Sequence, residues 1–154
     1  MRALIPIFLA GALSAVASEP AWLTDLAAAK QAAAKEQRPL LLHFTGSAWC
    51  PPCKLLHAEA LATPAFAEVA KKYVLVKLDY PPLSERAEAK VKANPALAKL
   101  MEIKQQYAVP GFPTTILLSP SGTETGRRVG YEKGLGLAAY MAQLEKGGNS
   151  GALR

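Results

Sequence analysis

The chain has 154 residues, of which 51% are hydrophobic and 19% are charged, and its formal net charge is +6. This length suits one domain, and the composition can bury a core and is not that of a disordered chain. Two cysteines are too few for a disulfide-dense mini-protein or a four-cysteine zinc module, and no uncharged apolar run reaches the roughly 18 residues of a transmembrane helix. Multidomain, fibrous and membrane-spanning classes are therefore excluded.

Residues 1–17 have the layout of a secretory signal peptide. Met1-Arg2 is a short positive start, residues 3–17 are uncharged and mostly apolar, and Ala15-Val16-Ala17 supplies the small residues of a cleavage site. A helical membrane anchor is the alternative, for which the apolar run is short. We expect residues 1–17 to be cleaved, residues 18–146 to form the folded domain, and the mature protein to be periplasmic or secreted.

The basic residues do not predict a nucleic-acid interface. Without Arg2, 17 basic and 12 acidic residues leave a net charge of +5, and Lys71-Lys72 and Arg127-Arg128 are the only adjacent basic pairs. No aromatic residues alternate with them, whereas nucleic-acid-binding domains usually gather such residues on one face. We interpret the charge as a solvated surface that favours acidic partners or anionic membranes.

The first half of the domain predicts alternating helices and strands. An amphipathic helix is expected over Pro20–Arg38, and the apolar run Pro39–Thr45 is typical of a buried strand. A helix is expected from Cys50 toward Leu61, and Thr63-Pro64 starts the next one, because Thr is a good N-cap and Pro is tolerated in the first turn. Tyr73–Asp79 is the second predicted strand.

The second half completes an α/β domain. Its expected elements are a helix capped by Ser84, a helix over Ala96–Tyr107 capped by Asn94, strands over Thr114–Leu118 and Thr125–Tyr131, a helix over Glu132–Lys146 and a flexible tail over 147–154. This order predicts a mixed sheet with helices on both faces.

One motif carries chemistry, the segment Trp49-Cys50-Pro51-Pro52-Cys53 between the first strand and the next helix. Cysteines three apart at a helix start lie on one face, close enough to form a disulfide. At the N-cap, the sulfur of Cys50 lies beside free N–H groups and the positive end of the helix dipole, which favour the reactive thiolate. The alternative is a structural disulfide, but so small a loop stabilises by only about 2 kcal/mol, against about 3 for fifteen residues. We therefore predict a reversible redox pair.

Three segments, Leu40–Lys54, Val76–Asp79 and Val109–Thr114, resemble the thioredoxin superfamily. The chain is most similar to exported bacterial thioredoxin-like proteins of the thiol–disulfide interchange type, over about residues 36–146. The resemblance implies a thioredoxin fold, with a central mixed sheet of about four strands and helices on both faces. It also implies a protein-disulfide oxidoreductase with no metal or other cofactor.

The resemblance also implies roles for individual residues. Cys50 corresponds to the attacking nucleophile and Cys53 to the buried resolving thiol, with Trp49 packed beside them. Pro113 matches the family's cis-proline, which faces the disulfide, and Phe112 before it offers backbone for pairing with substrate. The Cys-Pro-Pro-Cys sequence differs from the Cys-Gly-Pro-Cys of thioredoxins, so the redox potential does not carry over.

His43 departs from the family pattern, because thioredoxins usually carry a buried Asp just before the active-site loop. Lys77 matches the lysine that partners this Asp. Alternation along the strand predicts that His43 lies beneath the site, near Cys53 and Lys77, and out of water. Two readings stay open: a hydrogen-bonded structural histidine, or a neutral base that accepts the proton of Cys53 and is kept uncharged by Lys77. The segment between Asp79 and Val109 is also longer than in a minimal thioredoxin, which indicates a partner surface or additional packing.

The motif and the resemblance are compatible with two functions. The first is an exported thiol–disulfide oxidoreductase, monomeric, that reduces disulfides in exported proteins and takes electrons from a membrane donor of the thiol–disulfide interchange type. The alternative is a copper-handling or protein-binding module on the same fold, for which Cys50, Cys53 and His57 could imitate a ligand set. Copper-delivery relatives take their histidine from near the cis-proline, and no histidine follows His57. We therefore expect no metal site, and His57 as a solvated helix residue.

Overall fold

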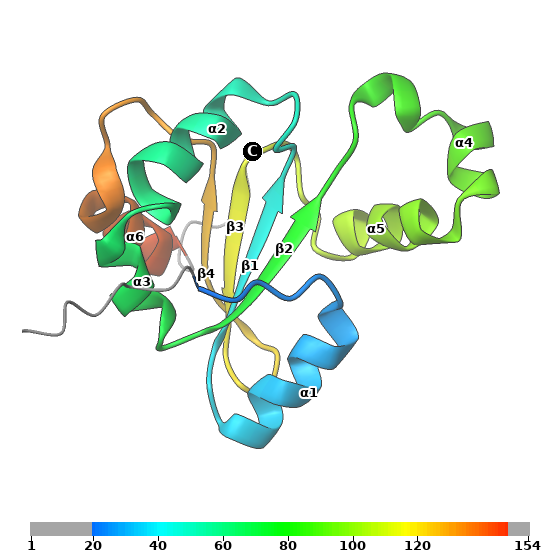
Figure 1. The fold of residues 1–154 in the computed structure, drawn as a ribbon. Helices are drawn as coiled ribbons and strands as arrows, with labels where there is room; N and C mark the ends of the chain where they lie inside the picture. Colours follow the sequence, from blue (N-terminus) through cyan, green and yellow to red (C-terminus); the bar gives the residue numbers. More distant parts are fainter. Residues whose placement is uncertain (1–19, 148–154) are drawn as a thin grey trace, which may run out of the picture.

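A single four-stranded mixed sheet forms the centre of the computed structural model, which describes residues 20–147 (Figure 1). The strands are β1 (Leu40–Thr45), β2 (Val74–Asp79), β3 (Thr114–Leu118) and β4 (Glu124–Val129). Their order across the sheet is β2-β1-β3-β4, with β1 parallel to β2 and antiparallel to β3, and β3 antiparallel to β4. The predicted α/β fold with a mixed sheet is confirmed.

Helices cover both faces of this sheet. The helical elements of the described residues are α1 (Leu26–Glu36), α2 (Pro51–Leu56), the π-helical turn η1 (His57–Leu61), α3 (Pro64–Ala70), the 3₁₀ turn η2 (Leu83–Glu85), α4 (Glu88–Ala93), α5 (Pro95–Gln106) and α6 (Gly136–Lys146). Within residues 20–147, no helix has both the length and the apolar content needed to cross a membrane.

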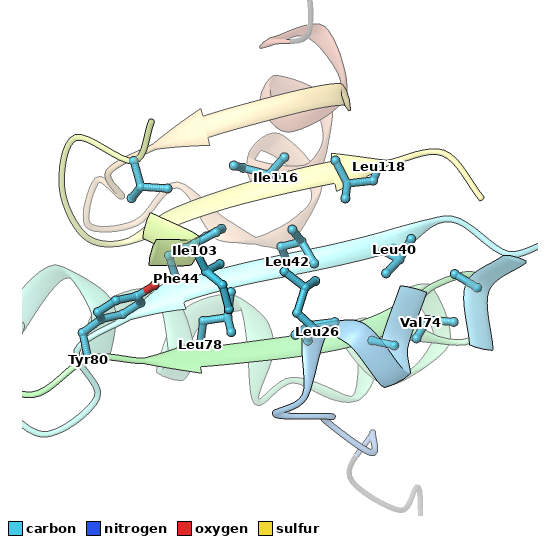
Figure 2. Close-up of a cluster of buried hydrophobic side chains, with 14 residues drawn as sticks. Leu26, Leu40, Leu42, Phe44, Val74, Leu78, Tyr80, Ile103, Ile116 and Leu118 are labelled. Atoms are coloured by element: carbon cyan, nitrogen blue, oxygen red, sulfur yellow. The ribbon is translucent and has the colours of Figure 1, made fainter. Parts of the chain in front are cut away.

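Two hydrophobic clusters lie on opposite sides of the sheet, because side chains alternate along each strand. Leu40, Leu42 and Phe44 of β1 pack with α1 and α5 in the cluster that Figure 2 shows. Leu41, from the same strand, faces a second cluster built with α2, η1, α3 and α6. All six residues of β1 are buried, as expected for a central strand with helices on both faces.

The predicted helix over Pro20–Arg38 is wrong in its first part, because α1 begins only at Leu26. Asp25 is the N-cap, and its carboxylate accepts hydrogen bonds from the backbone N–H groups of Ala27 and Ala28. Before it, Leu23 is extended and forms a parallel bridge with Val76 of β2. Pairing with the edge strand satisfies backbone groups here that a helix would have satisfied locally.

Two more predicted helix starts need correction. Ser84 lies in η2 and caps nothing, and α4 begins after Ala87 without a side-chain cap. The last helix begins at Gly136 rather than Glu132, since the preceding residues form a turn in which Gly134 has a φ of 80°. The predicted caps Thr63 and Asn94 are confirmed, because each side chain accepts a backbone N–H of its helix. The predicted signal peptide and nearly all of the predicted tail lie outside the described residues.

Three segments meet at one edge of the sheet. The parallel strands β1 and β2 end there at Thr45 and Asp79, which are partners in the register. The antiparallel strand β3 begins at the same edge, where Thr114 pairs with Phe44. The loop to the cysteines, the start of the segment after β2 and the residues before β3 therefore converge at this edge.

Candidate functional site

A disulfide joins Cys50 and Cys53 at the start of α2. Cys50 is the N-cap, with extended backbone (φ −93°, ψ 107°), and Pro51 follows in the first turn. The extended backbone of Cys50 has a local cause, because Pro51 disfavours helical backbone at the residue before it. The two Cα atoms are 5.3 Å apart, and both cysteines are almost fully buried. An attacking sulfur at this position would lie beside the free N–H groups of the first turn.

Trp49 is fixed in place beside the disulfide. Its indole N–H donates to the carbonyl of Tyr80, just beyond β2, at 2.7 Å. Its ring meets that of Phe112 edge-on, with centroids 5.8 Å apart. The residue at position 46 must be glycine for this packing, because a Cβ there would overlap the indole. The loop before the cysteines is thus tied to the segments that follow β2 and precede β3.

The peptide bond between Phe112 and Pro113 is cis, directly before β3. Two hydrogen bonds hold the turn: Thr114 Oγ1 donates to the carbonyl of Gly111 at 2.8 Å, and Gly130 N–H donates to the carbonyl of Pro113 at 2.7 Å. The ring of Phe112 also packs on Tyr80, with centroids 4.9 Å apart.

His43 is buried on the sheet face that α2 covers, opposite Lys77 of β2 and Thr115 of β3 in the register. Its Nδ1 lies 3.2 Å from Thr115 Oγ1, which accepts the hydroxyl proton of Tyr140 at 2.7 Å. The Thr115 hydroxyl also has one proton of its own to donate. The hydrogen-bonding groups of all three side chains are satisfied together when Thr115 donates this proton to Nδ1 of His43. His43 is then the neutral tautomer with its proton on Nε2.

The surroundings keep His43 neutral. Burial lowers its pKa from 6.5 to about 3, the Lys77 ammonium and His57 lower it too, and the Asp79 carboxylate opposes them. His43 and Lys77 also line one cavity of about 450 Å³, together with Trp22 and His57. Trp22 belongs to the extended N-terminal segment, and its ring centroid lies 5.9 Å from that of His43.

Asp79 organises the loop above this cavity. Its carboxylate accepts the backbone N–H of Ser47 at 2.9 Å and the hydroxyl of the same residue. The Lys77 ammonium lies 3.5 Å from the Asp79 carboxylate. Lys77 is therefore partnered by a carboxylate from its own strand.

His57, considered as a metal ligand, is exposed at the start of η1. Among residues 20–147, no three His, Cys, Asp or Glu side chains are grouped so as to hold a metal ion.

Arg86 is a residue at this site that the sequence analysis did not find. Its guanidinium lies 5.3 Å from the ring centroid of Trp49 and 5.6 Å from that of Phe112. The only signal in the sequence was the unusual length of the segment between Asp79 and Val109, which gave no individual residue.

The comparison with known proteins agrees with this geometry. The family model described as a thioredoxin-like domain matches residues 26–145. The chain belongs to this family. A solved structure described as DsbH oxidoreductase superposes with a TM-score of 0.68 at 25% identity, covering 96% of each chain. The predicted thioredoxin-superfamily membership and thioredoxin fold are thereby confirmed.

Two curated relatives come from Chlamydia pneumoniae. The chain is 30% identical over 112 residues to the disulfide bond reductase DsbH, covering 72% of this chain and 63% of the relative. It is 31% identical over 120 residues to the thioredoxin-related protein DsbJ, covering 71% of this chain and 33% of the relative. The chain thus spans less than two thirds of the length of either relative.

Proposed function

We propose that the protein is an exported thiol–disulfide oxidoreductase that reduces disulfides in extracytoplasmic proteins. The thiolate of Cys50 attacks one sulfur of a client disulfide, that bond breaks, and the client's other cysteine leaves as a thiolate. Cys53 then loses its proton and attacks the sulfur of Cys50, which releases the second client thiolate. Two electrons have passed to the client, and the Cys50–Cys53 disulfide must be reduced again by an external dithiol.

The observation that carries this proposal is the disulfide at the start of α2. A disulfide that closes so short a loop adds little to stability, which favours a reversible redox role over a structural one. The similarity to a relative named disulfide bond reductase favours the reducing direction. The signal-peptide layout of residues 1–17 supports export.

The residues around the disulfide have supporting roles in this proposal. Trp49 and the backbone before Pro113 form the surface on which the client segment lies, with Phe112 beside them. His43 handles the proton of Cys53 in the second step, because it is buried on the sheet face that α2 covers and burial keeps its imidazole neutral, the form that can accept a proton. A pKa of about 3 makes the imidazolium short-lived, so the proton passes on to the cavity that Lys77 also lines.

The partners follow from the chemistry and the proposed location. The clients are disulfide-containing exported proteins, and the electron donor is a membrane protein of the thiol–disulfide interchange type. The protein acts as a monomer and contacts the membrane only through this donor.

Dithiothreitol-driven reduction of insulin tests the activity. The wild-type protein should catalyse it, and Cys50→Ser should abolish catalysis; full activity in that variant would overturn the mechanism. Equilibration with glutathione buffers tests the direction. A potential near that of thioredoxin, about −270 mV, supports a reductase, whereas a value near −120 mV would make the protein an oxidant.

Stopped-flow measurement of the two half-reactions tests His43. His43→Ala should slow resolution of the mixed disulfide much more than its formation. Equal slowing of both steps, or none, would reduce His43 to a packing residue.

A further inference from the structure

The segment between β2 and β3 forms an arm beside the active site. It contains η2, α4 and α5, and Figure 1 shows these helices projecting beyond the carboxyl end of β2, on the opposite side from α2. The arm is anchored at its base, where the Tyr80 hydroxyl donates to the carbonyl of Leu100 in α5 at 2.8 Å. Leu83, in η2 at the beginning of this segment, is 76% exposed.

Arg86 brings a positive charge from this arm to the rim of the disulfide. Its guanidinium contacts the rings of Trp49 and Phe112, the residues that directly precede Cys50 and Pro113. Lys104 of α5 adds a second cation, 5.9 Å from the ring centroid of Phe112. The two aromatic residues on which we expect a client to lie are therefore flanked by cations.

Among the described residues, the side chain of Arg86 has no hydrogen-bond acceptor. Within residues 20–147 its guanidinium has no ion pair with a carboxylate, and its Nε is buried without a hydrogen-bond partner. A planar guanidinium held on two rings is also well suited to a carboxylate, which it can bind through two parallel hydrogen bonds.

We propose that Arg86 selects client disulfides that lie beside an acidic residue, by pairing with that carboxylate while the disulfide lies on Trp49 and Phe112. The exposed Leu83, whose carbonyl accepts the backbone N–H of Arg86, offers the client an apolar contact on the same turn. This inference rests on the proposed function and adds a client preference to it. The arm is then a selective surface, which agrees with the net positive charge of the chain.

Two synthetic peptides test the proposal. Each contains one intramolecular disulfide, and they differ only in Glu or Gln next to the first cysteine. Pre-reduced protein is mixed with each peptide in a stopped-flow instrument, and tryptophan fluorescence gives the second-order rate constant. We expect the wild-type protein to react about fivefold faster with the Glu peptide, the value of one partly solvated ion pair.

Variants of Arg86 locate the preference. Arg86→Gln should bring the ratio of the two rates to about one, and Arg86→Glu should make the Gln peptide the faster substrate. Lys90→Gln, an exposed position of α4, is the matched control: it removes the same charge from the arm and should keep the wild-type ratio. Circular dichroism verifies that each variant is folded.

Other outcomes overturn the inference. Equal rates for the two peptides in the wild type would show that Arg86 has only a packing role. An unchanged ratio in Arg86→Gln, or one lost equally in Lys90→Gln, would assign the preference to overall charge. Reaction with neither peptide would refute the proposed function itself, and the two failures are thus distinguishable.

Discussion

Protonation of His43 should couple folding stability to pH. The pKa of His43 is about 3 in the folded protein and 6.5 in an unfolded chain, so the unfolded chain binds one more proton between these values. Its contribution to stability is therefore complete above pH 6.5 and is lost as the pH falls toward 3. The linkage between protonation and folding predicts that the free energy of unfolding falls, through His43 alone, by about 2 kcal/mol between pH 7 and pH 5 and by about 3 kcal/mol between pH 7 and pH 4.

Urea unfolding of the oxidised protein at these pH values measures the loss. Carboxylates titrate in the same range, so the informative quantity is the difference between the wild type and His43→Gln, which cannot protonate here. The variant should lose about 2 kcal/mol less than the wild type between pH 7 and pH 5. Equal losses in the wild type and His43→Gln would refute the burial argument.

Two further substitutions test the packing of the site. Gly46→Ala should lower the free energy of unfolding by about 1–3 kcal/mol and slow the insulin reaction, because the new Cβ displaces the Trp49 indole; an unchanged urea midpoint would contradict this. Thr115→Val leaves the Tyr140 hydroxyl and His43 Nδ1 without their shared partner, and should lower the free energy of unfolding by about 1–3 kcal/mol. Nitrogen NMR of His43 should then report loss of the Nε2–H tautomer, whereas an unchanged spectrum would show that Thr115 does not select it.

The parts of the fold that could be predicted were those encoded locally. The apolar runs of β1 and β2 indicated central strands, and Thr63 and Asn94 cap helices as expected because a cap depends on neighbouring residues. The segment around Leu23 could not be predicted, because its extended conformation comes from pairing with β2, a contact distant in the sequence.

The same distinction applies to the site. The spacing of Cys50 and Cys53 predicted a disulfide, because cysteines three residues apart lie within one helical turn. The burial of His43 followed from alternation along a central strand. Its hydrogen-bonded chain through Thr115, and the approach of Arg86 to Trp49, depend on how separate elements pack, which no local pattern encodes.

Trapping of the mixed disulfide tests the central claim most directly. Reduced Cys53→Ser protein is incubated with a disulfide-containing client, and the adduct is digested and located by mass spectrometry. We predict a covalent adduct on Cys50 that persists because no resolving thiol remains, and no adduct with Cys50→Ser under the same conditions. An adduct formed equally well by Cys50→Ser would contradict the assignment of Cys50 as the nucleophile.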